Sequence, residues 1–425
     1  MKRLLTIRDR IIASTVARDS MIVFTGTMAG NVASYLYHLY LGRALGPAAY
    51  GELSSIISLL YIFGVVTLVW QTTLTKFFSE YKARGDDSAA RHLAVRTLRF
   101  LGYSLGAGLI IIIALAPLTV GFLHLGSARF IVWGYLAFAV STLAMVFASV
   151  FQGYQLFVLF SAYVALSGII RLTLSIPAAA GGVEWVLVSW VASSAILFAL
   201  PVFFLRWLFS AAPYRGILKI RGVIIYSLPA FAALLGLTSL FSTDVIMARH
   251  FLPADQAGLY AAIAVLGKII FYATSSIGAV VFPKVAERVA TGKIYRKIVG
   301  AGLILVGAGS LILTALYFVI PELVIRMLFG TGYLTAAPYL GTFAVFISLF
   351  CLGYILVMTN LAAGNTGIWI IPIIMAFVQV LFISLRHENA GQIISVNFFV
   401  SFLFLVSVAA ATYFNLKKYH GTKRE

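Results

Sequence analysis

The chain alternates long apolar runs with short polar or basic segments. Runs such as 101–118, 183–205 and 298–320 reach or approach the roughly 20 residues that a helix needs to cross a hydrocarbon core. We place twelve spans, at 21–41, 53–74, 99–121, 130–151, 155–177, 184–205, 223–248, 258–282, 298–320, 338–359, 366–385 and 393–414. The pattern predicts an all-α integral membrane protein.

The least obvious boundary lies inside the almost continuously apolar stretch 130–180, which is too long for one helix. Its only sensible break is the segment 151–155, Phe-Gln-Gly-Tyr-Gln, where we predict a tight hairpin. Merging the two spans would move later basic loops to the opposite side of the membrane. Length and charge therefore agree on twelve spans.

Composition supports this assignment. Hydrophobic residues make up 62% of the chain and charged residues 10%, against about 45–50% and about 25% in a soluble domain. The net charge of +18 comes mostly from Lys and Arg at both ends and in alternate loops. The positive-inside rule then predicts a multi-pass protein of the cell membrane with both termini in the cytoplasm. The basic excess favours anionic lipid headgroups, and we expect no nucleic-acid partner.

Two further features limit the possibilities. The segment 1–20 is basic and amphipathic without an uninterrupted apolar core, so we expect a helix on the cytoplasmic surface instead of a removable signal. The one cysteine, Cys351, falls within a span, which predicts no disulfide framework. We also expect no metal site and no cofactor.

A pattern of Arg, Pro, Gly and Glu occurs twice, about half a chain apart. In each copy the Arg precedes the Pro by four residues and the Gly precedes the Glu by 29. The two copies comprise Arg43, Pro47, Gly51 and Glu80, and Arg249, Pro253, Gly258 and Glu287. The Arg and Pro fall at the outer ends of spans 1 and 7, where proline suits a turn.

The repeat predicts two six-helix bundles related by a pseudo-two-fold axis along the membrane normal, with a central cavity between them. We expect the bundles at 21–206 and 223–414, joined by a cytoplasmic linker at 207–222. A basic cytoplasmic tail follows at 415–425.

Charged residues inside spans are the first candidates for function, because each costs ~2.5–3.5 kcal/mol at the helix centre. They are Arg171, Asp244 and Lys268. A cavity with two cations and one anion is net positive and suits a phosphate-bearing substrate. A structural ion pair is the alternative for Asp244, whose depth matches Arg171 better than Lys268. Lys268 has no carboxylate at its own depth, which favours a functional role.

Span 1 carries a polar stripe at three- and four-residue steps. Its members are Thr27, Asn31, Ser34, Tyr35 and His38. Such a stripe lines a cavity or forms a helix contact, since Asn and Ser also join membrane helices. An imidazole titrates near neutral pH, so His38 is either a packing residue or a proton-coupling group.

The sequence contains no enzyme signature such as Gly-x-Ser-x-Gly, a P-loop or His-Glu-x-x-His. The largest outer loop, 321–337, is short for a catalytic site. We therefore expect a transporter and not an enzyme.

Two motifs carry a family resemblance. The turn L-G-R-A-L-G-P-A-A-Y-G-E-L after the first span resembles the signature of Wzx-type polysaccharide flippases, which belong to the multidrug/oligosaccharidyl-lipid/polysaccharide superfamily. The later segment A-G-L-Y-A-A-I-A-V-L-G-K, followed by F-P-K-V-A-E, also resembles the sequences of these flippases. The matching positions are Arg43, Pro47 and Gly51 in the first motif, and Gly258, Lys268, Pro283, Lys284 and Glu287 in the second.

The resemblance covers most of the chain and implies two six-helix bundles around a central, often cationic cavity. It also implies that a polyprenyl-(pyro)phosphate-linked oligosaccharide moves from the cytoplasmic to the outer leaflet by alternating access. Implied partners are that substrate, membrane lipids, and a polysaccharide polymerase or glycosyltransferases. The resemblance is compatible with transport coupled to H⁺ and with transport coupled to Na⁺. Twelve spans fit this family better than peptidoglycan-precursor flippases, which have two further helices.

Three alternatives remain. A drug/cation antiporter of the same superfamily would need acidic groups deep in spans 1–6, where only Glu184 occurs, at a span end. A major-facilitator transporter would have a different basic loop after span 2 and a longer central loop. A membrane polysaccharide polymerase or ligase would need a larger outer loop than 321–337.

Overall fold

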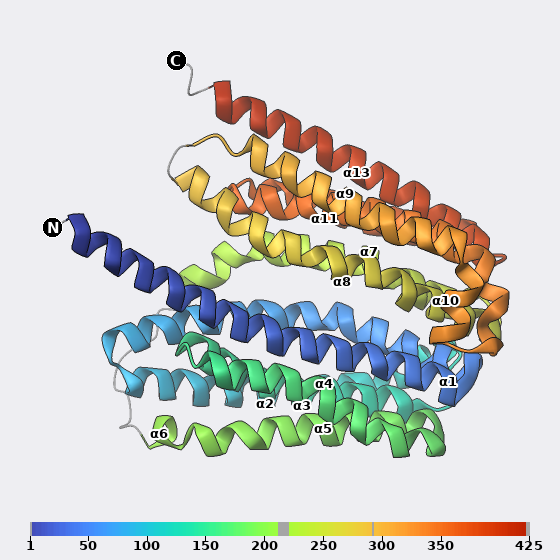
Figure 1. The fold of residues 1–425 in the computed structure, drawn as a ribbon. Coiled ribbons are helices and arrows are strands. Elements are labelled where there is room, and N and C mark those ends of the chain that lie inside the picture. The colour runs from blue at the N-terminus through green and yellow to red at the C-terminus, as the bar shows by residue number, and fades with distance from the viewer. Residues whose placement is uncertain (1, 211–220, 291–292, 422–425) are drawn as a thin grey trace. The chain divides into compact units, whose positions relative to one another are not determined.

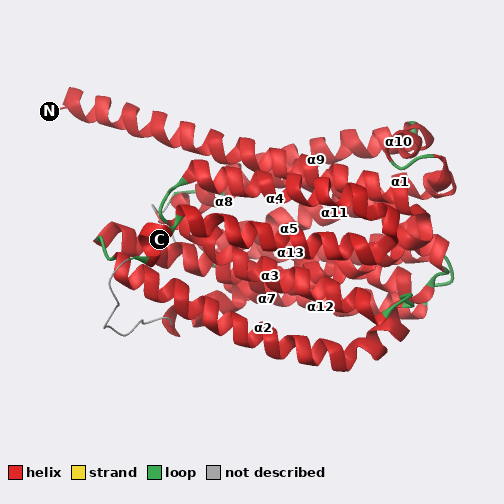
Figure 2. Ribbon diagram, turned by 90° about the horizontal axis from the view of Figure 1, so that it is seen from below, coloured by secondary structure: helices red, strands yellow, loops and turns green. Residues whose placement is uncertain are grey.

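A computed structural model describes residues 2–210, 221–290 and 293–421. Some side chains in these ranges, among them those of 2–20, 221–227 and Glu287, are not described. All regular structure in the described residues is helical (Figures 1 and 2), which confirms the predicted all-α membrane fold class. Parts of the predicted linker and tail, 211–220 and 422–425, lie outside the described residues.

The helices follow the predicted spans closely. Those before the linker are α1 (Lys2–Arg84), α2 (Asp87–Leu123), α3 (Ala128–Gly153), α4 (Phe157–Ala178), the 3-10 turn η1 (Ala179–Gly181), α5 (Gly182–Phe204) and α6 (Arg206–Phe209). Those after it are α7 (Arg221–Phe251), α8 (Ala254–Ala290), α9 (Arg296–Val319), α10 (Pro321–Leu328), η2 (Thr331–Ala336), α11 (Ala337–Ala362), η3 (Thr366–Trp369), α12 (Ile370–Leu385) and α13 (Ala390–Gly421).

Ten segments of the described residues are long and apolar enough to cross a membrane. Two of them are long enough for two crossings, namely Met21–Arg84 with 64 residues and Phe157–Phe204 with 48. The first is interrupted at Gly46, where φ is 73° and ψ is 174°, a conformation that glycine adopts without strain. The second is interrupted by η1, and Gly182 beside it has φ 80°. The described chain therefore accommodates the twelve predicted crossings.

The predicted hairpin at 151–155 is present. α3 ends at Gly153 and α4 begins at Phe157, with Gln155 at φ 57° and the Leu156 amide donating to the Phe151 carbonyl over 2.8 Å. The length argument that separated spans 4 and 5 is thus confirmed.

Tyr154 ties this hairpin to neighbouring helices. Its hydroxyl donates to Asp87 Oδ1 over 2.8 Å, and its carbonyl accepts from Lys82 Nζ over 2.7 Å. Burial, and then the Asp87 carboxylate, raise the pKa of the Tyr154 phenol, so it stays a protonated donor.

The N-terminal segment is helical, as expected, but it is not a separate element. α1 runs from Lys2 into the first span without a break at residue 20. Location of residues 1–20 on the membrane surface remains a prediction.

The chain folds as two compact units built from discontinuous segments. The first comprises Met1–Ala44, Val66–Val120 and Gly126–Ile224, and the second comprises Leu45–Val65, Gly121–Leu125 and Ile225–Glu425. The outer half of the second predicted span therefore groups with α7–α13. The predicted domain boundaries remain a prediction.

Candidate functional sites

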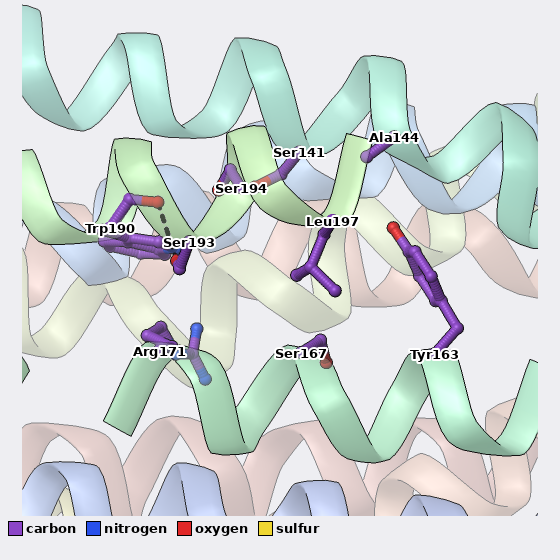
Figure 3. Close-up of a pocket in the computed structure, with 9 residues that line it drawn as sticks. All are labelled: Ser141, Ala144, Tyr163, Ser167, Arg171, Trp190, Ser193, Ser194 and Leu197. Atoms are coloured by element: carbon purple, nitrogen blue, oxygen red, sulfur yellow. Dashed lines mark hydrogen bonds between the residues drawn. The ribbon is translucent and has the colours of Figure 1, made fainter. Parts of the chain in front are cut away.

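The first unit contains a cavity of about 290 Å³ between α3, α4 and α5, which we call the Arg171 cavity (Figure 3). Its lining residues are Ser141, Ala144, Tyr163, Ser167, Arg171, Trp190, Ser193, Ser194 and Leu197. This lining combines one cation with hydroxyl groups and two aromatic rings, and it includes no carboxylate. Figure 3 shows the Arg171 side chain extending from α4 toward Trp190 and Ser193 on α5.

Small residues bring α1 and α4 into close contact. A Cβ on Gly168 would overlap the Gly30 carbonyl oxygen, and one on Gly26 would lie 2.5 Å from the Ser161 carbonyl oxygen. The Ser161 hydroxyl donates to the Ile22 carbonyl over 2.6 Å. Glycine and serine at such contacts let membrane helices approach along their backbones. This approach brings α1 side chains within reach of Arg171.

Arg171 is held by a hydroxyl and two rings. Its Nη2 donates to Ser34 Oγ over 2.7 Å, and its guanidinium carbon lies 5.1 Å from the centre of the Tyr37 ring and 5.4 Å from that of Trp190. A guanidinium stacked on rings in this way keeps its in-plane N–H groups available to an anion. Among the described residues, its buried Nε has no hydrogen-bond partner.

The polar stripe predicted on span 1 lies mostly outside this cavity. Gly30, Ala33 and Tyr37 form the buried face of α1, whereas Asn31 is exposed and Ser34 is half-buried. Ser34 alone of the stripe has a described bond to Arg171. Thr27, Tyr35 and His38 are half-buried, and none of them lines the cavity.

The sequence interpretation missed most of the lining. Trp190, Ser193 and Ser194 fall on α5, and Ser193 and Ser194 form an adjacent hydroxyl pair in a helix whose other polar residues are Glu184 and Ser189. Ser194 Oγ lies 2.8 Å from Ser141 Oγ on α3. The adjacent serines were the available signal, but a hydroxyl in a span is equally suited to joining helices.

A second constellation is buried in the second unit, and we call it the Asp244 network. Asp244 on α7 is fully buried, and its Oδ2 accepts from the Tyr260 hydroxyl over 3.0 Å. Asn397 Nδ2 donates to that hydroxyl over 2.9 Å, and Gln379 Nε2 donates to Asn397 Oδ1 over 2.9 Å. Four helices, α7, α8, α12 and α13, each contribute one side chain.

Not every oxygen of this network is satisfied. Asp244 Oδ1 and Gln379 Oε1 are buried and have no hydrogen-bond partner among the described residues. Leaving such an oxygen unpaired in a low-dielectric interior is costly. The arrangement therefore suits a proton or a small cation.

Lys268 on α8 is buried beside this network. Its Nζ lies 4.5 Å from the centre of the Phe241 ring, and it interacts electrostatically with Asp244 without an ion pair within 4.0 Å. The described hydrogen-bond partner of Asp244 is Tyr260 and that of Arg171 is Ser34, and the depth match of Asp244 with Arg171 stays a prediction. Gln379 and Asn397 were missed, although an amide deep in an apolar span is itself a signal.

The two copies of the repeat meet inside the second unit. A Cβ on Gly258 would overlap the Pro47 carbonyl oxygen, and one on Gly51 would lie 2.9 Å from the Gly258 amide nitrogen. The backbones at these two glycines are therefore in direct contact, which only glycine permits.

The two arginines of the repeat differ. Arg249 is 3% exposed and forms an ion pair with Glu52 at 3.0 Å, whereas Arg43 is exposed. Pro253 is exposed at the start of α8, and Glu80 lies on the helix surface 4.0 Å from Lys76. The side chain of Glu287 lies outside the described residues.

No family model matches the chain, and no curated protein matches its sequence. Its fold is similar to that of solved transporters. A multidrug resistance MATE family transporter of the MOP superfamily, in an inward-facing conformation, has a TM-score of 0.75 and 11% identity over 95% of this chain and 99% of that chain. The lipid II flippase MurJ in an inward closed conformation has a TM-score of 0.72 and 11% identity over 93% of this chain and 87% of that chain. A mutant of the Vibrio cholerae MATE transporter VcmN has a TM-score of 0.66 and 12% identity over 96% of this chain and 98% of that chain.

These likenesses define a class. The protein is a multi-pass membrane protein with a transporter fold. That fold is similar to the one seen in a MATE transporter and in MurJ, and at 11% identity the likeness concerns the fold.

Proposed function

We propose that the protein moves a polyprenyl-(pyro)phosphate-linked oligosaccharide from the cytoplasmic to the outer leaflet by alternating access. The observation that supports this most is the Arg171 cavity, in which one guanidinium lies among hydroxyls and aromatic rings. No covalent step is required of the protein, and we propose that it is not an enzyme. The Wzx-type resemblance of the two motifs favours the same substrate class.

The chemistry of the cavity suits the polar end of such a lipid. An unassisted sugar headgroup would lose its hydrogen bonds across ~30 Å of hydrocarbon. Ser167 and Ser193 offer hydroxyls to sugar oxygens, and Trp190 offers a flat apolar face to a pyranose ring. The Arg171 guanidinium suits a phosphate, to which it can donate two parallel hydrogen bonds.

The cavity is less suited to a cationic drug. Its lining holds one positive charge and no carboxylate, so a cation would be repelled without compensation. The buried carboxylate Asp244 belongs to the other unit. A drug/cation antiporter remains the second candidate because of that carboxylate.

We propose that the Asp244 network binds the ion whose gradient drives transport. A proton or Na⁺ at Asp244 Oδ1 would satisfy the unpaired oxygen and neutralise the carboxylate. Gln379 Oε1 is a further oxygen without a partner in the described network. His38 is a weaker candidate, since it stacks edge-on against Tyr37 at 5.3 Å and lies outside this network.

The proposed setting follows the charge distribution of the chain. We place the protein in the cell membrane with both termini in the cytoplasm. Glycosyltransferases would then build its substrate on the cytoplasmic side, and a polysaccharide polymerase would use it on the outer side. Membrane lipids are the remaining partners, and nucleic acid is not among them.

A leaflet-translocation assay tests the proposal. The protein would be reconstituted into vesicles with fluorescent polyprenyl-pyrophosphate-linked sugars, and an impermeant quencher would report transfer between leaflets. We expect transfer with the native protein, a large loss with Arg171→Gln, and partial rescue with Arg171→Lys. The matched control is Arg129→Gln, because Arg129 has a 75% exposed side chain. Equal transfer by all four proteins, or transport of a hydrophobic cation instead, would contradict the proposal.

A further inference from the structure

α2 exposes more of its surface than the other described spans. In its most apolar 18-residue stretch 6% of the residues are buried, against 28% or more in every other candidate span of the described residues. Near the turn with α1 its packing face is formed by Leu93, Thr97 and Leu101, which are 2–4% exposed. The opposite face of α2 is therefore open to the bilayer.

Two arginines and two aromatic residues share that open face at the start of the span. Arg99, Phe100 and Tyr103 follow Arg96 by three, four and seven residues, so all four lie on one side of the helix. All four are exposed, Phe100 to 54% and Tyr103 to 80%. Seven residues cover ~10 Å along a helix, which is enough to reach from the polar edge of a bilayer to its acyl chains. We call these four residues the α2 stripe.

The aromatic residues of the α2 stripe suit a membrane interface. The Phe100 ring lies 5.7 Å from the ring of Trp70 on α1, which fixes its position within the first unit. Aromatic side chains concentrate at the level of the headgroups, where one end of the ring is apolar and the other wet. Arginine side chains in the same place cover apolar surface with their stems and keep the guanidinium in the polar layer. The α2 stripe therefore has the composition of a boundary between headgroups and acyl chains.

The two arginines of the α2 stripe have no carboxylate to balance them. Within the described ranges neither Arg96 nor Arg99 forms an ion pair. The acids at this end of the first unit, Glu80, Asp86 and Asp87, already interact with other side chains. Like charges one turn apart on a helix repel each other, and an anion bound between them would replace that repulsion by attraction. An uncompensated positive charge thus lies beside an apolar surface.

We propose that the α2 stripe binds an anionic phospholipid, with the phosphate between Arg96 and Arg99 and the acyl chains along Tyr103 and the exposed residues beyond it. A guanidinium donates two parallel hydrogen bonds to a phosphate, and basic residues next to a span attract anionic headgroups. The positive-inside rule predicts that this lipid belongs to the cytoplasmic leaflet. It is a resident of the bilayer and not the transported molecule, so the site does not rest on the proposed transport function.

The start of α9 provides a comparison for the effect of charge alone. Arg296 and Lys297 are also exposed cations in the first turn of a span. No aromatic residue follows them before Tyr317. A lipid attracted by charge alone would bind equally at both places, whereas a lipid that also contacts rings would prefer the α2 stripe.

The first experiment measures lipid binding by native mass spectrometry of the full chain in detergent. The probes are phosphatidylglycerol and phosphatidylcholine with identical acyl chains. We expect the tightest site to prefer phosphatidylglycerol about tenfold or more. Arg96→Gln/Arg99→Gln should remove the preference, and Arg96→Lys/Arg99→Lys should keep part of it. The matched control Arg296→Gln/Lys297→Gln loses the same charge and should keep all of it. Equal affinity of the native protein for the two lipids, or equal losses in the two glutamine variants, would overturn the site.

Two further measurements separate a lipid from a free anion. Tyr103→Ala should weaken the binding of both lipids, because it removes a contact with the part that they share. Inorganic phosphate should displace phosphatidylglycerol no better than chloride at the same ionic strength. Displacement specific to phosphate, or full binding of both lipids by Tyr103→Ala, would contradict a lipid site.

The second experiment locates the lipid in nanodiscs. A fluorophore would be attached at Ala107→Cys in a Cys351→Ser background, because Ala107 is exposed one turn beyond the α2 stripe. Phosphatidylglycerol with a nitroxide on its acyl chain should quench this fluorophore more than the corresponding phosphatidylcholine, and the difference should vanish when both arginines of the stripe are glutamine. Leu118→Cys is the matched reporter, because Leu118 is 74% exposed near the other end of α2, and it should show no difference. Equal quenching by the two lipids at Ala107→Cys would overturn the proposal, whether or not the protein moves a lipid-linked sugar.

Discussion

Lys268 and Asp244 are both buried in the second unit and interact electrostatically, yet they form no ion pair within 4.0 Å. Lys268 Nζ lies over the Phe241 ring, and Asp244 accepts a hydrogen bond from Tyr260. An ammonium group in this position is only partly compensated. We propose that an anionic substrate completes this compensation, and any ion that neutralises Asp244 would strengthen its attraction to Lys268.

The first prediction concerns the charge of Lys268. Lys268→Met keeps the length of the side chain and removes the ammonium, so binding of a phosphate-bearing lipid should weaken about tenfold or more. Lys268→Arg should retain part of the affinity. Lys76→Met is the control, because the Lys76 side chain is 61% exposed. Binding would be measured with a labelled polyprenyl-pyrophosphate sugar, and full binding and transport by Lys268→Met at normal expression would refute the assignment.

The second prediction concerns the coupling ion. Asp244→Asn imitates a neutralised carboxylate, so it should bind the anionic lipid at least as well as the native protein and lose the dependence on an ion gradient. Tyr260→Phe removes one donor from Asp244 and should shift the dependence without abolishing it. Translocation would be measured across separate pH and Na⁺ gradients. An Asp244→Asn protein that responds to both gradients like the native one would exclude this network from coupling.

The third prediction concerns Trp190 in the Arg171 cavity. Trp190→Leu removes both the ring near Arg171 and a stacking face for a pyranose, so translocation of the oligosaccharide lipid should fall strongly. Binding of the same polyprenyl pyrophosphate without sugars should change less. Trp185→Leu is the control on the same helix, because Trp185 is 60% exposed. Equal losses for the glycosylated and sugar-free lipids would indicate that Trp190 acts only through the position of Arg171.

The transmembrane pattern could be predicted from the sequence because its determinants are local. A run of about 20 apolar residues is a strong signal by itself, and the break at 151–155 followed from length together with the positions of the basic loops. The interruption at Gly46 coincides with the turn predicted beside Pro47.

The candidate sites were harder to predict from the sequence than the spans, because they depend on which helices face each other. The stripe on span 1 was correctly seen as polar, but the packing face of α1 uses Gly26, Gly30 and Ala33. Depth along a helix could not identify Tyr260 and Asn397 as the neighbours of Asp244, because they come from other helices. The interaction of Arg249 with Glu52 joins the second copy of the repeat to the residue that follows Gly51 of the first, and no periodicity along one helix reveals that contact.

The last prediction tests the close contact between the backbones at Gly258 and Pro47. A Cβ on Gly258 would overlap the Pro47 carbonyl oxygen, so Gly258→Ala forces the two backbones apart. Overpacking of this kind costs about 1–3 kcal/mol. Gly102→Ala is the matched control, because a Cβ there has no neighbour within 4 Å and alanine favours the helix by about 0.5–1 kcal/mol. Thermal unfolding in nanodiscs should therefore show a lower midpoint for Gly258→Ala and an unchanged or higher one for Gly102→Ala. Matching midpoints for the two variants would mean that the backbones at Gly258 and Pro47 are not in contact in the folded protein.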